Sequence, residues 1–181
     1  MSSNKSHPSV YYFIYSFTFL CYGLLSGSLG PVIPYLAKQS GLPETSYSFL
    51  FVARSLGNIV GFVVFKWLQK QKFSNFGHKV ISCHVLIDIV FLNIFSNIRS
   101  PFWEFVTWLC MGSSRYCVLT ATNICLMGIS GNKASSWLIF VNAIFGVGAL
   151  LSPILIRLFE LNYYQILGLC YLTFGLLCKW F

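Results

Sequence analysis

The chain has 181 residues, of which 56% are hydrophobic and 9% charged, and its formal net charge is +8. Soluble globular domains carry far more charge, about a quarter of their residues, so this composition excludes a soluble domain. The excess positive charge lies mostly between long apolar stretches. There, membrane orientation and anionic lipid headgroups explain it, and we expect no nucleic-acid partner.

A short polar tail, residues 1–9, precedes six apolar stretches that together occupy residues 10–181. A helix of about 20 apolar residues crosses a hydrocarbon core of about 30 Å, so each stretch is long enough for one span. The predicted spans are residues 10–37, 46–68, 79–97, 101–130, 134–159 and 163–181. Continuous runs of this kind lack the alternation of membrane β-barrels, and they predict an all-α integral membrane protein with a single multi-pass domain.

The charges alternate between the two ends of these predicted spans. Basic residues without acidic partners occur before the first span, in every second connection and at the C-terminus: Lys5, Lys66, Lys70, Lys72, Lys79, Lys133 and Lys179. The other three connections each carry one base and one acid. This is the pattern of the positive-inside rule, and it predicts six spans with both termini on the cytoplasmic side.

Small residues recur at helical spacing in three of the predicted spans. They are Gly23 and Gly27 in the first, Gly57 and Gly61 in the second, and Gly148, Ser152 and the following Pro153 in the fifth. Membrane helices pack closely where small residues let their backbones approach, so we expect these positions to hold the helices together.

Three charged residues lie away from the ends of the predicted spans, where charge is costly. Asp88 is near the middle of the third span, Arg115 near the middle of the fourth, and Arg54 in the outer half of the second. One interpretation is a structural ion pair between Asp88 and Arg115. Another places Arg115 at a cavity that binds an anionic or hydroxyl-rich solute, with Asp88 steering it. His84, one turn from Asp88, could assist proton coupling or could simply pack between helices.

Asn58, Asn123 and Asn142 are the neutral polar candidates, because an amide can bind a solute or join neighbouring helices. The tryptophans near the span ends, Trp108 among them, fit the interfacial aromatic belt. The chain has no phosphate-binding loop, no paired carboxylates and no nucleophile with a base. Its seven cysteines lie in the apolar stretches without a C-x-x-C pair. We therefore expect no enzyme activity, cofactor or metal site.

Three segments resemble the N-terminal six-helix half of major facilitator superfamily transporters, closest to the branch of fucose permeases and sodium-dependent glucose transporters. They are residues 23–36 (GLLSGSLGPVIPYL), residues 55–79 with Gly61, Lys66, Gly77 and Lys79 of the loop signature, and residues 123–156 with GNKAS and NAIFGVGALLSPILI. The resemblance implies alternating-access transport, a gating role for the loop residues, and a cavity position for Asn123. It also implies a second six-helix half as partner.

The sequence departs from this family at three positions. Phe65 stands where the loop signature has an acid, Leu119 stands where an acid precedes the fourth-helix asparagine, and Asn142 replaces a histidine. These departures favour a non-transporting structural subunit as the alternative to a transporter of a sugar or organic anion. A channel or scaffold unrelated to the family is a third possibility. Because the chain ends without the family's hydrophilic linker, we expect a fragment or half-unit.

Overall fold

The computed structural model describes residues 8–70, 76–95, 97–98, 100–160 and 162–178. All regular structure within these residues is helical, which confirms the predicted all-α class. The elements are α1 (Pro8–Ser40), η1 (Glu44–Ser48), α2 (Phe49–Lys70), α3 (Phe76–Phe95), α4 (Pro101–Ser130), η2 (Gly131–Lys133), α5 (Ala134–Phe159) and α6 (Asn162–Cys178). The bounds of α4 and α5 coincide with the predicted fourth and fifth ranges, and most of the other ends differ by a few residues.

Helix α1 includes the Gly- and Pro-rich segment and continues a few residues beyond its predicted end, to Ser40. Pro31 and Pro34 lie inside this helix and each lacks the N–H of a regular turn, a defect that helices packed in a membrane bundle tolerate. Gly41 ends the helix. It adopts a φ of 72°, and its N–H bonds the Ala37 carbonyl at 2.9 Å, the usual termination by a left-handed residue.

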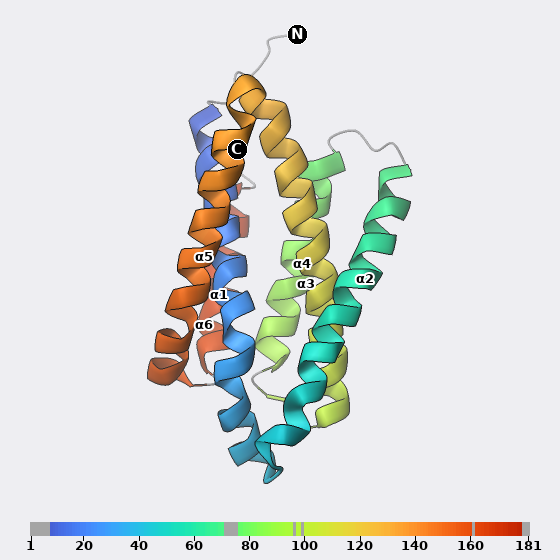
Figure 1. Ribbon diagram of the computed structural model, residues 1–181, viewed down its shortest axis with the longest axis vertical. Helices are drawn as coiled ribbons and strands as arrows, with labels where there is room; N and C mark the ends of the chain where they lie inside the picture. The colour runs from blue at the N-terminus through green and yellow to red at the C-terminus, as the bar shows by residue number, and fades with distance from the viewer. Residues whose placement is uncertain (1–7, 71–75, 96, 99, 161, 179–181) are drawn as a thin grey trace.

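Successive helices run in opposite directions along the long axis of the bundle, so α1 begins and α6 ends at the same end (Figure 1). The end of α2, the beginning of α3 and η2 between α4 and α5 also lie at this end. Lys70 in the last turn of α2 and Lys133 in η2 therefore share it, whereas Lys38 and Arg157 occupy last turns at the opposite end. Three lysines of the predicted basic set, at positions 5, 72 and 179, fall outside the described residues.

The helices pair in a reciprocal pattern. The most extensive contacts are between α1 and α5 and between α2 and α4, while α3 packs on α4 and α6. If α1, α2 and α3 are matched in order with α4, α5 and α6, the α1–α5 pair corresponds to the α4–α2 pair. The bundle thus divides into two units of three helices, and matched helices of the two units run in opposite directions. The match does not extend to every contact, because α3 packs extensively on α4 whereas α6 makes only slight contact with α1.

The surface of the bundle is strongly apolar. Leu150 is 77% exposed and Ile139 70%, and many other large apolar side chains on α2, α4 and α5 are also exposed. A soluble protein rarely leaves so much contiguous apolar surface in water. Four helical segments of the described chain are long and apolar enough to cross a membrane: Ser9–Ser40, Glu44–Lys70, Phe76–Phe95 and Pro101–Phe159, the last containing both α4 and α5.

Candidate functional site

Glycines of α1 and α5 bring these two helices into backbone contact. A Cβ added at Gly23 would collide with the Phe145 carbonyl, and one added at Gly27 would collide with the Ala149 carbonyl. Gly148 faces the other way, and a Cβ there would meet the backbone of α1. Only glycine permits this approach, because the neighbouring atoms are backbone and cannot move aside.

The α2–α4 pair is built in the same way. A Cβ added at Gly57 would collide with the Leu109 carbonyl, and one at Gly61 would lie 2.5 Å from the Ser113 carbonyl oxygen. Gly112 makes the corresponding contact from α4, because a Cβ added there would lie 2.5 Å from the carbonyl oxygen of Arg54 in α2. These contacts set the separation between α2 and α4, the two helices that carry Arg54 and Arg115.

Two further residues of the predicted packing set lie in α5. Ser152 is fully buried, and its Oγ lies 3.3 Å from the Tyr163 hydroxyl of α6, which joins these consecutive helices. Pro153 lies inside α5 on its exposed side. The residue therefore interrupts the helix ladder without contributing to the buried contacts around Ser152.

Asp88 of α3 is fully buried and accepts a hydrogen bond from the Tyr22 hydroxyl of α1. Ser114 of α4 lies beside it and donates to the His84 carbonyl at 3.1 Å. The His84 ring is turned away from the carboxyl, because its Nδ1 lies 2.9 Å from the Val80 carbonyl oxygen of the preceding turn. This group, the Asp88 cluster, joins three helices, and Oδ1 of Asp88 has no hydrogen bond among the described residues.

Arg54 and Arg115, both half-buried, lie together in a second polar region. Arg54 reaches from α2 to α1, where it donates to the Ser26 carbonyl at 2.9 Å and also to the Ser26 hydroxyl. Arg115 of α4 lies over the Phe145 ring of α5, with Cζ 5.5 Å from the ring centroid, a cation–π contact. A cavity of about 10 Å³ lies between them, and we call it the arginine cavity. Its lining residues are Leu25, Ser26, Arg54, Trp108, Met111, Gly112 and Arg115.

The predicted ion pair between Asp88 and Arg115 is not formed. Both residues lie in the described part of the chain, and no salt bridge joins them there: Asp88 engages α1 through Tyr22, whereas Arg115 points toward α5 and α2. The two residues lie on neighbouring helices, but their side chains leave those helices in different directions. Proximity in the sequence does not fix this direction, so the sequence left the two interpretations of Asp88 and Arg115 open.

The three asparagines do not gather with the arginines. Asn58 is half-buried on α2, and Asn123 on α4 is half-buried with its Oδ1 lacking a hydrogen bond within the described chain. Asn142 on α5 is exposed, and its Nδ2 donates to the Leu138 carbonyl at 2.7 Å on its own helix. None of them lines the arginine cavity.

The predicted gating residues lie where α2 ends and α3 begins. Gly61 belongs to the α2–α4 contact described above, and Lys66 is exposed, with Nζ 6.0 Å from the Phe62 ring centroid. Gly77 lies against the Cys125 side chain of α4, and Lys79 is exposed. The segment that joins these positions, residues 71–75, falls outside the described residues.

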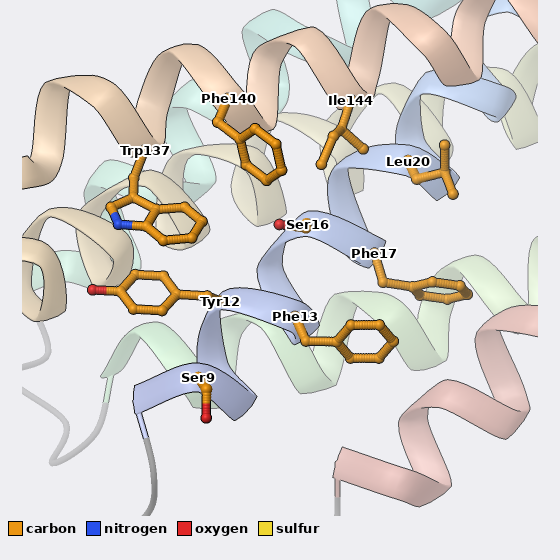
Figure 2. A pocket seen from close by; sticks show the side chains of 9 residues that line it. All are labelled: Ser9, Tyr12, Phe13, Ser16, Phe17, Leu20, Trp137, Phe140 and Ile144. Carbon is orange, nitrogen blue, oxygen red and sulfur yellow. The ribbon is translucent and has the colours of Figure 1, made fainter.

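A larger hollow of about 590 Å³ lies between the beginnings of α1 and α5, and nine side chains line it (Figure 2). Its lining is aromatic and aliphatic apart from Ser9 and Ser16, and the Tyr12 and Trp137 rings stack within it with centroids 4.0 Å apart. It includes none of the predicted binding residues. Because this surface offers few hydrogen-bonding groups, it suits apolar chains better than a polar solute.

Trp108 and Ser26 line the arginine cavity, and neither was predicted from the sequence as a site residue. We expected Trp108 in the interfacial belt, but it is 2% exposed, and its ring packs edge-on against Phe95, with the ring centroids 5.7 Å apart. A signal was present: Trp108 precedes Arg115 by seven residues, two helical turns, which places both on one face of α4. Ser26 carried no comparable signal.

Comparison of the chain with models of protein families, with curated proteins and with solved structures gave no match. The resemblance to major facilitator transporters therefore stays a prediction.

Proposed function

We propose that this protein is a six-span membrane protein of the transporter type, one half-unit of an alternating-access carrier for a small polar solute. An organic anion is the preferred cargo and a sugar the second choice. The observation that carries the proposal is the reciprocal pairing of α1 with α5 and α2 with α4. Many secondary transporters are built from such inverted repeats, with the solute bound near the membrane midplane where the repeats meet.

The chemistry of the repeat boundary supports an anionic solute. Arg54 from one three-helix unit and Arg115 from the other line the same cavity. Two guanidinium groups favour an anion over a cation. Alternating access needs a second six-helix unit to complete the pathway, either a further segment of polypeptide or another copy of this chain.

The alternative function is a non-transporting subunit that keeps the bundle for assembly. One observation favours it: Phe65 is 4% exposed in an apolar cluster with Val80, Cys117 and Ala121. In the family that the chain resembles, an acid at this position takes part in an ion-pair gate. An aromatic ring fixed in an apolar cluster provides no charge for such a gate.

Uptake into liposomes tests the transporter proposal. We expect saturable uptake of lactate, weaker uptake of glucose, and loss of lactate uptake in Arg115→Gln. Arg157→Gln is the matched control, because Arg157 is exposed in the last turn of α5. Absence of saturable flux from a chain that cross-links only as a monomer would refute transport and favour the subunit.

Sidedness is tested separately with a membrane-impermeant amine reagent on sealed vesicles. We propose that the end of the bundle that carries Lys70 and Lys133 faces the cytoplasm. Both lysines should then react from the same side, and Lys38 from the other. Reaction of Lys70 and Lys133 from opposite sides would contradict the six-span arrangement.

A further inference from the structure

The arginine cavity carries positive charge that the protein does not neutralise. Arg54 and Arg115 both line it, and none of the chain's acidic residues does. Neither arginine forms a salt bridge within the described chain, where Arg54 bonds only the neutral Ser26 and Arg115 contacts the Phe145 ring. Charges at this depth in a membrane bundle require a counter-charge, water or a ligand.

The same cavity contains hydrogen-bond donors without acceptors. Nε of Arg115 and Nε1 of Trp108 are buried and have no hydrogen-bond partner among the described residues. An unpaired donor buried away from water costs free energy, and an indole or guanidinium N–H can only donate. Two unpaired donors on α4, beside the positive charge of Arg54, favour a ligand that accepts hydrogen bonds and carries negative charge.

Glu104 is the acid nearest to this group along α4, one turn before Trp108. It is 2% exposed and its Oε2 lacks a hydrogen bond, as does the Trp108 Nε1, so the two do not bond each other. Glu104 also does not line the cavity. The acid therefore does not serve as counter-ion to Arg54 and Arg115.

The size of the cavity limits the ligand. Its volume of about 10 Å³ is close to what one water-sized sphere requires, so a sugar or an extended carboxylic acid does not fit in this conformation, and a monatomic anion requires only a small outward shift of the lining side chains. We propose that the arginine cavity binds one small inorganic anion, a halide such as chloride, between Arg54, Arg115 and Trp108. The anion balances the buried charge and joins α2 to α4. This role goes beyond transport, because it needs only the bundle and holds whether or not the protein moves a solute.

Thermal unfolding of the purified full chain in detergent tests the site, with chloride or bromide titrated against gluconate at constant ionic strength. We expect the unfolding midpoint to rise saturably with chloride and bromide and to stay unchanged with gluconate. Trp108→Phe keeps the ring and removes the N–H. It should weaken halide binding about tenfold or more, the loss expected for one hydrogen bond to a charged group. Trp67→Phe is the matched control on the exposed face of α2 and should bind as the native chain does.

Arg115→Gln should abolish the halide effect, and Arg157→Gln should retain it. If Arg115→Gln does not fold, Trp108→Phe still decides the question. Equal midpoints in chloride and gluconate would overturn the proposal, and so would unchanged halide affinity in Trp108→Phe. Stabilisation by lactate but not chloride would replace the halide with a carboxylate solute. The measurement involves no flux, so its failure and a failure of transport are distinguishable.

Discussion

Two polar clusters lie on neighbouring faces of α4, and they differ in the groups that are left without partners: a carboxyl oxygen, Oδ1 of Asp88, in the first, and N–H donors in the second. The Asp88 cluster pairs an acceptor with a hydroxyl donor, Tyr22, from another helix. The arginine cavity contains two cations and an indole N–H but only Ser26 as a polar acceptor among its side chains. A carboxyl can accept hydrogen bonds from the hydroxyl groups of membrane helices, whereas guanidinium groups present many donors and need acceptors from carbonyls, rings or a ligand.

We expect the largest effect from a substitution that disrupts the close contact between α2 and α4. The arginine cavity depends on this contact, whereas the Asp88 cluster does not. In Gly57→Ala the new Cβ collides with the Leu109 carbonyl, which cannot rotate away. Overpacking of this kind should lower the free energy of unfolding by about 3 kcal/mol, measured by denaturant titration in detergent. Gly128→Ala is the control, because a Cβ there meets nothing within 4 Å. It should be neutral or stabilising by up to about 1 kcal/mol. Equal effects of the two substitutions would contradict the close approach.

The second-largest expected effect concerns the Asp88 cluster and leaves the arginine cavity unchanged. Tyr22→Phe removes the donor to Asp88 and leaves a buried acceptor unsatisfied, so we expect a loss of about 2 kcal/mol in the free energy of unfolding. Halide-dependent stabilisation should persist, because Tyr22 does not line the arginine cavity. Tyr116→Phe is the control, since the Tyr116 ring packs edge-on against Phe62 and its hydroxyl bonds none of the described residues. It should change stability by less than about 0.5 kcal/mol. A native-like Tyr22→Phe would show that Asp88 is satisfied in another way.

The helices and the clusters were not equally predictable. The length of the apolar runs locates the helices, because a membrane span requires a continuous run. Gly41 and Gly131 mark the C-terminal ends of α1 and α4, because glycine favours the positive φ found at both positions. The partners of the buried charges depend on rotation of each helix about its axis. A sequence without strong amphipathic periodicity specifies that rotation poorly. Trp108 shows the limit: its spacing from Arg115 indicated a shared face, but nothing indicated that this face is buried.

The smallest expected effect tests this rotation directly. Sequence reasoning favoured an ion pair, in which Asp88→Asn and Arg115→Gln would compensate each other. The structure separates the two side chains, so their losses in free energy of unfolding should add, with a coupling below about 0.5 kcal/mol in a double-mutant cycle. The cycle should be measured in gluconate, so that halide binding at Arg115 does not enter the comparison. A coupling above about 1 kcal/mol, with the double variant more stable than the sum predicts, would indicate contact between the residues. The Asp88 cluster and the arginine cavity would then form one network, and the need for an external anion would disappear with the unpaired charge.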